Sequence, residues 1–150
     1  NSFEMELREI NLFKKILSMK NTTIQEREFD KCNDIFDITI PQANKIIFPY
    51  SFFFCRHLRI VNIPSSVTEI KKYAFAYCLE LYSISFPDCL LNIEEKAFYQ
   101  SRYIRIVKIH NSMNEKGKLA IANYFKSSTY VSCKLEFYWL ALILLITKWR

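Results

Sequence analysis

The chain has 150 residues, of which 51% are hydrophobic and 16% aromatic, and it carries a formal net charge of +6. This composition excludes intrinsic disorder, because so apolar a chain can bury enough surface to offset the entropy lost on folding. The basic residues are scattered and no run of five like charges occurs, which argues against a nucleic-acid-binding tail. We therefore expect one domain, whose positive charge would favour an acidic partner or an anionic membrane surface.

Residues 1–11 place Phe3, Leu7 and Ile10 at helical spacing after Ser2. The pattern predicts an N-terminal helix that caps the fold, and a degenerate earlier repeat is the alternative. Charged side chains interrupt residues 1–20, so this segment does not resemble a secretory signal. Because residue 1 is Asn rather than Met, we expect a fragment or a processed product.

Residues 12–110 repeat with a period of 23 residues. Several apolar columns recur in register, and a fixed period of this length is typical of a solenoid. The columns are Leu12, Ile35, Leu58, Leu81 and Ile104; Ile24, Ile47, Ile70 and Ile93; Phe29, Phe52, Phe75 and Phe98; and Cys32, Cys55, Cys78 and Ser101. We predict a right-handed α/β solenoid with parallel strands and about five units.

Each unit is predicted to contain a short strand, a turn at Pro and a return segment. In the third unit, Val61 and Ile63 alternate with polar Asn62, so we expect both apolar side chains to face inward. Pro64 then ends the strand, because proline has no N–H to donate to a ladder. The Phe of each return segment should fill the space between the strand layer and the return layer. The other inward pairs are Ile38 and Ile40, Ile84 and Phe86, and Val107 and Ile109.

The chain contains five cysteines, an odd number, so at least one thiol has no partner within the chain. Cys32, Cys55 and Cys78 share one column, at the spacing of about 4.8 Å expected between parallel strands. Stacked side chains point the same way, which disfavours a disulfide, and we expect a ladder of small, buried, unreactive thiols. Cys89 and Cys133 lie outside this column, and the sequence leaves open whether they form a bridge.

These repeats resemble the BspA-like class of leucine-rich repeats, whose units run approximately LxxIxIPxxVxxIGxxAFxxCxxL. The resemblance covers residues 12–110, and the chain departs from it where the family has Gly after the second Ile. It implies a non-enzymatic recognition scaffold, found mainly in surface or secreted proteins of microbes and implicated in adhesion and protein binding. The matching residues of the third unit are Leu58, Val61, Ile63, Pro64, Val67, Ile70, Ala74, Phe75, Cys78 and Leu81, and the residues at the Gly position are Gln25, Phe48, Lys71 and Glu94.

After the repeats, residues 111–134 are predicted to form a polar loop at 111–118, around the only glycine, and a short helix at 119–125. Residues 135–150 are hydrophobic, with ten consecutive apolar residues from Phe137 to Ile146. This run has three interpretations: a truncated membrane anchor, a buried cap that closes the solenoid, or an out-of-frame tail.

No residue pattern indicates catalysis. The two histidines, His57 and His110, occupy non-equivalent positions without cysteine or carboxylate neighbours at metal-ligand spacing. Glu94 and Glu95 are adjacent in a turn and should point in different directions, and one glycine precludes a glycine-rich phosphate loop. We predict no catalytic residue, no metal site and no cofactor.

The outward strand positions should form one continuous face, on which we predict ligand binding. Aromatic and arginine side chains, the types favoured at binding hot spots, recur in one column of this face. We expect a protein or glycan partner and a microbial cell-surface adhesin or antigen, with membrane contact through Phe137 to Ile146. The alternative is an intracellular structural scaffold that uses the C-terminal run as a cap. The candidate binding residues are Phe36, Arg59, Tyr82, Arg105 and Lys108.

Overall fold

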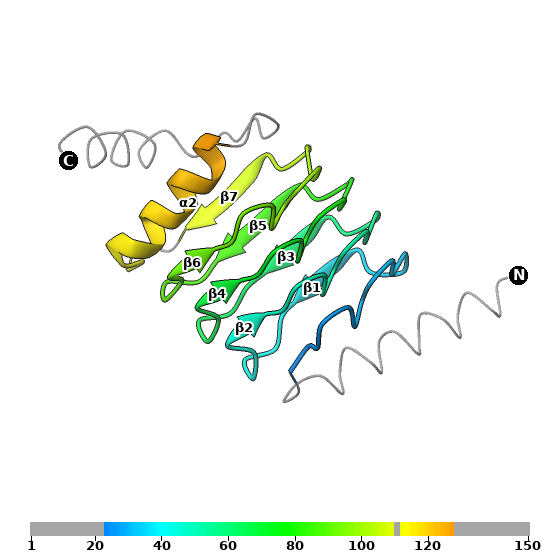
Figure 1. The fold of residues 1–150 in the computed structure, drawn as a ribbon, viewed down its shortest axis with the longest axis horizontal. Coiled ribbons are helices and arrows are strands. Elements are labelled where there is room, and N and C mark those ends of the chain that lie inside the picture. Colours follow the sequence, from blue (N-terminus) through cyan, green and yellow to red (C-terminus); the bar gives the residue numbers. More distant parts are fainter. Residues whose placement is uncertain (1–22, 110–111, 128–150) are drawn as a thin grey trace, which may run out of the picture.

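A computed structural model of the chain describes residues 23–109 and 112–127. Its strands form two parallel sheets, and Figure 1 shows successive turns stacked side by side, with helix α2 (Glu115–Ser127) at the C-terminal end. Sheet A contains β1 (Asp37–Thr39), β3 (Ile60–Asn62), β5 (Ser83–Phe86) and β7 (Ile106–Ile109), in that order. Sheet B contains β2 (Ile46–Ile47), β4 (Glu69–Ile70) and β6 (Asn92–Ile93).

Each strand pairs with the equivalent strand of a neighbouring turn, always with an offset of 23 residues. In sheet A, Asp37 pairs with Ile60, which pairs with Ser83, which pairs with Ile106. Sheet B keeps the same offset, since Ile47 pairs with Ile70. The parallel-strand solenoid predicted from the sequence is thus confirmed. The short strands of sheet B are an addition that the sequence did not predict.

The side chains expected to face inward from sheet A do so. Val61 and Ile63 of the third unit are both buried, and Asn62 between them is exposed. Pro64 opens a turn in which the Val67 N–H donates to the Pro64 carbonyl at 3.1 Å. β-Branched residues suit these positions because their stiff side chains pack well on a pleated surface.

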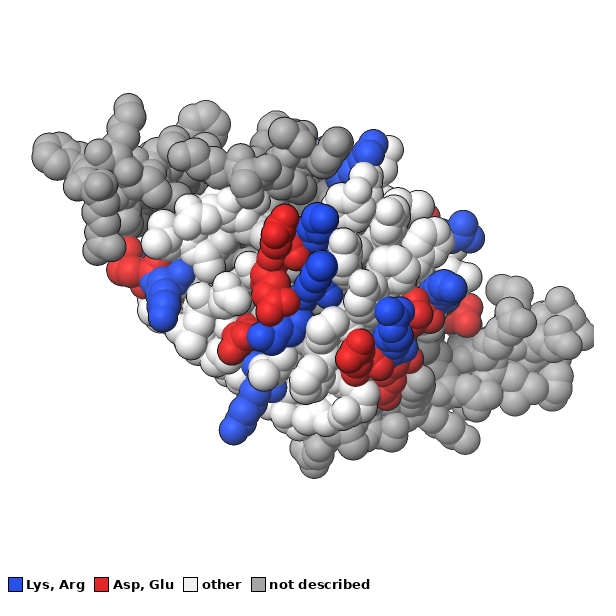
Figure 2. Space-filling view, in the orientation of Figure 1, with Lys and Arg blue, Asp and Glu red and all other residues white. Residues whose placement is uncertain are grey.

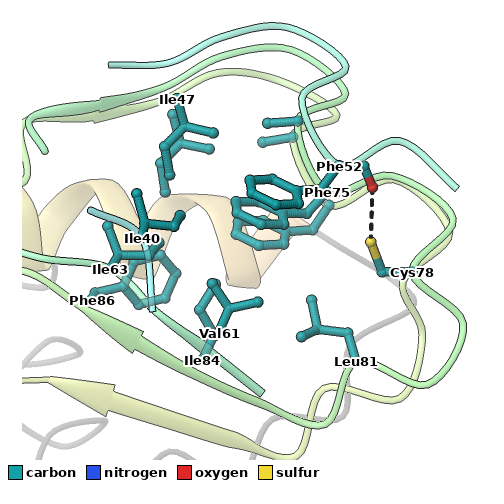
Figure 3. Packing of buried hydrophobic residues seen from close by; sticks show 14 of the residues in the cluster. Ile40, Ile47, Phe52, Val61, Ile63, Phe75, Cys78, Leu81, Ile84 and Phe86 are labelled. Atoms are coloured by element: carbon teal, nitrogen blue, oxygen red, sulfur yellow. Dashed lines mark hydrogen bonds between the residues drawn. The ribbon is translucent and has the colours of Figure 1, made fainter. Parts of the chain in front are cut away.

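The Phe of each unit forms a continuous stack through the core, which Figure 3 shows for Phe52 and Phe75. Neighbouring rings have centroids 5.1–5.3 Å apart and are within 6° of parallel, an offset-stacked arrangement that adds to the energy of burial. Burial of one such ring contributes roughly 2–3 kcal/mol. The four rings, Phe29, Phe52, Phe75 and Phe98, are each at most 3% exposed.

The cysteine column is a ladder of hydrogen bonds. The Cys55 thiol donates to the Phe29 carbonyl at 3.0 Å, and the Cys78 thiol donates to the Phe52 carbonyl at 3.3 Å (Figure 3). Ser101 continues the column, because its hydroxyl donates to the Phe75 carbonyl at 2.6 Å.

These thiols are free and weakly acidic. Burial, with a smaller contribution from Cys32, raises the pKa of Cys55 to about 12, and burial also raises the pKa of Cys78 well above its ordinary value. The prediction of buried thiols is therefore confirmed for both residues, whereas Cys32, the first member of the column, is only half-buried. Cys89 is a free, half-buried thiol that donates to the Ser65 carbonyl, and Cys133 lies outside the described residues.

The return segment forms a corner whose backbone links consecutive turns. The Phe75 N–H donates to the Ala97 carbonyl and the Tyr77 N–H to the Tyr99 carbonyl, both at 2.8 Å, and earlier turns repeat this pattern. Two residues per corner are left-handed, with φ of 56–62°, which costs about 1–2 kcal/mol for a residue with a Cβ. These residues form two columns, Arg27, Tyr50, Tyr73 and Lys96, and Lys31, Phe54, Tyr77 and Gln100. Lys71, at the family's Gly position, is in neither column, so that position imposes no left-handed backbone here.

Helix α2 begins earlier than the sequence suggested. The prediction of a loop through residue 118 is wrong for Glu115 to Lys118, which are helical. The cause is an N-cap: the Asn114 side-chain oxygen accepts from the Gly117 N–H at 2.7 Å, and the Lys118 N–H donates to the Asn114 carbonyl. A polar stretch with one glycine resembles a loop, yet here it is the first turn of a helix.

Helix α2 covers the C-terminal end of the solenoid. The Phe98 N–H has no later turn to pair with among the described residues, and it donates instead to the Tyr124 hydroxyl at 2.7 Å. Gly117 lets the helix approach closely, because a Cβ at this position would lie 2.5 Å from the Leu90 carbonyl oxygen.

The predicted N-terminal cap at residues 1–11 and the hydrophobic segment at 135–150, including Phe137 to Ile146, lie outside the described residues. Within residues 23–109 and 112–127, no helix has both the length and the hydropathy that a membrane crossing requires.

Candidate functional site

The candidate site is the outer face of sheet A together with the positions immediately before each strand, here called the sheet A surface. Strand alternation creates it: in β3, Val61 points into the core while Ile60 and Asn62 are exposed. The residue before the strand, Arg59, is exposed as well. Each turn therefore contributes up to three outward side chains to the same face.

Four of the five predicted residues form one unbroken column. The main chains of Phe36, Arg59, Tyr82 and Arg105 lie on adjacent rungs, because each N–H donates to the preceding member's carbonyl. The distances are 2.6 Å from Arg59 to Phe36, 2.9 Å from Tyr82 to Arg59 and 2.9 Å from Arg105 to Tyr82. All four side chains are exposed; Phe36 is 49% and Tyr82 48% exposed, although both are large apolar groups.

Aromatic and cationic groups contact each other along this surface. The Arg59 guanidinium lies 5.4 Å from the centre of the Phe36 ring, and the Arg105 guanidinium lies 6.0 Å from that of Tyr103. These separations are at the outer range of cation–π attraction. Within the described ranges, neither arginine forms an ion pair, so both charges remain available to a partner.

The sequence analysis did not select Tyr103, the most exposed large apolar residue described, at 59%. Tyr103 shares a column with His57 and Glu80, two positions before the predicted column, and its side-chain type was the signal that could have identified it. In this neighbouring column, His57 Nδ1 lies 3.1 Å from the Glu80 carboxylate, and the His57 ring lies 6.2 Å from that of Phe36. His57 thus belongs to a surface pair.

Lys108, the fifth predicted residue, is exposed on β7 three positions after Arg105, at the position paired with Ser85. Ser83 of β5 pairs with Ile60 and with Ile106 on this face, yet it is only 5% exposed. The surface is therefore lower at this point of the third rung, between the arginines of the second and fourth.

Glu94, one of the two adjacent carboxylates considered for catalysis, has structural contacts. Glu94 accepts from the Lys71 ammonium at 3.2 Å and from the Lys72 N–H at 2.8 Å, and Glu69 accepts from Lys71 at 2.7 Å. Hydrogen bonding to Glu69, and then to Glu94, raises the pKa of Lys71. These ion pairs link β4 and β6 and keep the Glu69 and Glu94 carboxylates paired with the Lys71 ammonium. Such an arrangement holds the charges in place rather than preparing a carboxylate for proton transfer.

Among the residues that the structure describes, no cluster of three His, Cys, Asp or Glu side chains could hold a metal ion. Figure 2 shows, on the face in view, Lys and Arg side chains lying beside Asp and Glu side chains instead of gathering in one basic area.

The chain was compared with known proteins. No curated protein matches it. Among solved structures, a leucine rich cell surface protein from Faecalibacterium prausnitzii is similar, with 20% sequence identity and a TM-score of 0.43. The similarity covers 61% of this chain and 32% of that one, so the chain spans about a third of that protein's length.

The family model of the BspA type leucine rich repeat region, which is built of six copies, matches residues 22–137. This range includes every described strand and helix α2, and it covers well over half of the chain. The register of 23 residues, the buried Phe column and the Pro turns are the structural counterpart of that match. The chain therefore belongs to the BspA-type leucine-rich repeat family.

Proposed function

We propose that this chain is a non-enzymatic recognition module whose sheet A surface binds a protein partner. The observation that carries the proposal is the column of exposed Phe36, Arg59, Tyr82 and Arg105 on adjacent rungs. Exposed aromatic and arginine side chains are the groups that dominate binding energy at protein interfaces. Their backbones are held here by a main-chain ladder, so little backbone ordering remains to oppose binding.

The partner surface should be acidic and contain an apolar patch. Arg59, Arg105 and Lys108 present three positive charges on this face, and opposite charges on a partner would steer association and fix its orientation. Phe36, Tyr82 and Tyr103 supply the large apolar groups that would be desolvated at the centre of an interface. A glycan partner on this surface is the alternative.

Display at a microbial cell surface is a further part of the proposal, supported by what the family resemblance implies. Protease treatment of intact cells that express the tagged full chain tests it. Cleavage on intact cells is the expected result. Protection on intact cells, with cleavage only after lysis, would favour the intracellular scaffold.

The binding proposal is tested first by photo-crosslinking. Benzoylphenylalanine at Tyr82 should crosslink a surface protein of the cells that the module contacts, and the same group at Tyr99, on the corner, should not. The affinity of the captured protein is then measured for Arg59→Ala, Tyr82→Ala and Arg105→Ala combined. Hot-spot losses of at least 2 kcal/mol predict a weakening of about 30-fold or more.

The matched control removes two cations and one large apolar side chain elsewhere: Lys45→Ala, Leu91→Ala and Lys116→Ala, all exposed. It should leave affinity unchanged. Equal binding by the two triple variants, or crosslinking from Tyr99 in place of Tyr82, would contradict the proposal. A thermal melt shows that each variant is folded.

A further inference from the structure

A cleft of about 620 Å³ opens on the corner of the solenoid, outside the sheet A surface. This volume is in the range that holds small ligands. The lining comes from three consecutive turns, and three of its residues, Lys31, Phe54 and Tyr77, belong to one left-handed column of the corner. The lining residues are Lys31, Asn33, Phe53, Phe54, Arg56 and Tyr77.

Three aromatic rings form the apolar part of the cleft and contact one another. The Phe53 and Phe54 ring centres are 6.2 Å apart, and the Tyr77 ring lies 5.6 Å from each. The backbone beneath them is held by hydrogen bonds between turns, including Lys31 N–H to the Phe53 carbonyl at 2.7 Å and Phe54 N–H to the Ala76 carbonyl at 2.9 Å. The rings are therefore ordered before any ligand arrives, which lowers the entropy cost of binding.

The charged part of the cleft is entirely cationic. Lys31 and Arg56 are both exposed, and no Asp or Glu is among the lining residues. In the described part of the chain, neither cation forms an ion pair, and the Arg56 guanidinium lies 5.8 Å from the Phe54 ring centre. Asn33 adds an amide that can both donate and accept hydrogen bonds.

We propose that this cleft binds an acidic saccharide, with a uronic acid residue of a glycan as the recognised unit. The C–H face of a sugar ring would pack on Phe54 and Tyr77, because aromatic faces are apolar and carry partial negative charge. The Arg56 guanidinium would hold the carboxylate, for which its planar fork is suited, with Lys31 as a second cation. Asn33 would bond ring hydroxyls. A phosphate group would satisfy the two cations but leave the three rings uncovered, so the combined lining favours the saccharide.

Isothermal titration of the full chain with digalacturonic acid tests the proposal, and α-1,4-digalactose serves as the neutral probe. The two disaccharides differ only in carboxylate against hydroxymethyl groups. We expect the acid to bind at least about tenfold more tightly, since hydrogen bonds to charged groups are the stronger ones.

Two variants locate the site, and one serves as control. Arg56→Gln should weaken binding of the acid about tenfold and leave the neutral sugar unaffected, whereas Tyr77→Leu should weaken both. Lys45→Gln removes an equal charge from an exposed position outside the cleft and should change neither. A thermal melt confirms that each variant is folded.

The proposal is overturned if millimolar digalacturonic acid gives no binding, if the two disaccharides bind equally, or if Arg56→Gln binds like the unaltered chain. Tighter binding of free phosphotyrosine than of the sugar acid would likewise overturn it, in favour of a phosphorylated ligand. Arg56→Gln leaves the five predicted sheet A residues intact, so these outcomes are independent of the protein-binding proposal.

Discussion

Replacing Tyr124 with Phe removes one oxygen atom from the C-terminal end of the solenoid and tests how the stack of turns is closed. In the earlier turns, the N–H of the core Phe donates to the carbonyl of an Ala in the next turn, as Phe52 does to Ala74 and Phe75 to Ala97, both at 2.8 Å. The Phe98 N–H donates instead to the Tyr124 hydroxyl at 2.7 Å. Burial raises the pKa of this hydroxyl to about 12, so it remains protonated across the physiological range.

The expected loss of stability follows from the donor left behind. An N–H without a partner in a buried place costs about 1–3 kcal/mol, and the partial burial of this bond places the loss at about 1–2 kcal/mol. The Phe side chain keeps the ring contacts with Phe98 and Phe125, at 5.5 and 5.3 Å, so no cavity adds to the loss. For a chain of this size, the melting temperature should fall by roughly 3–6 °C.

The assay is urea unfolding followed by circular dichroism, together with hydrogen exchange of the Phe98 amide. Tyr103→Phe is the matched control, because its side chain is 59% exposed and the change should alter stability by less than about 0.5 kcal/mol. The contradicting result is equal stability of the two variants, with the Phe98 amide of Tyr124→Phe still protected from exchange. That result would refute the idea that the Tyr124 hydroxyl closes the stack of turns by accepting the Phe98 N–H.

Three further changes test other parts of the fold. Gly117→Ala should destabilise the chain by about 1–2 kcal/mol in urea unfolding, because the new Cβ would lie 2.5 Å from the Leu90 carbonyl; stabilisation, as helix propensity alone predicts, would contradict this. Lys96→Asn should raise the free energy of unfolding by about 0.5–1 kcal/mol, because Asn tolerates the left-handed φ of 62° better, and Lys72→Asn, outside the left-handed columns, should not. Above pH 9 the unfolded chain loses the Cys55 proton while the folded chain, in which the pKa of Cys55 is about 12, keeps it, so stability should fall as pH rises from 9 to 12. Cys55→Ser should make that fall shallower by up to about 1.4 kcal/mol per pH unit in urea titrations, and an unchanged slope would reject the assignment.

The inward-facing half of the fold was predictable because it repeats. Phe75, Val61 and Cys78 recur with equivalents at the same offset, and a side chain that recurs in every turn has the same buried surroundings in every turn. The turn at Pro64 was predictable for the same reason, since proline excludes a continuing ladder. Prediction failed where the sequence signal was short or ambiguous. Strands β2, β4 and β6 have two residues each, and the polar stretch around Gly117 has the composition of a loop.

The candidate site was predictable only in part. Strand alternation places Arg59 and Tyr82 on the outer face whatever the surrounding sequence is. The left-handed corner could not be predicted, because no Gly, Asn or Asp marks the eight positions, and the hydrogen bonds between turns impose the conformation. The corner cleft stayed hidden as well, since Asn33, Phe53 and Tyr77 belong to different columns and different turns, and only the assembly of the turns brings them together.

The constant offset of 23 residues also spaces equivalent side chains of the sheet A surface evenly from one rung to the next. Rungs are separated by about 4.8 Å, so Arg59 and Arg105, two rungs apart, hold their backbones roughly 10 Å from each other. For the proposed protein partner, this spacing predicts acidic groups separated by a multiple of that step. Insertion of one residue within a turn would disrupt the regular spacing of the outward side chains, whereas gain or loss of a whole turn would change only the length of the surface.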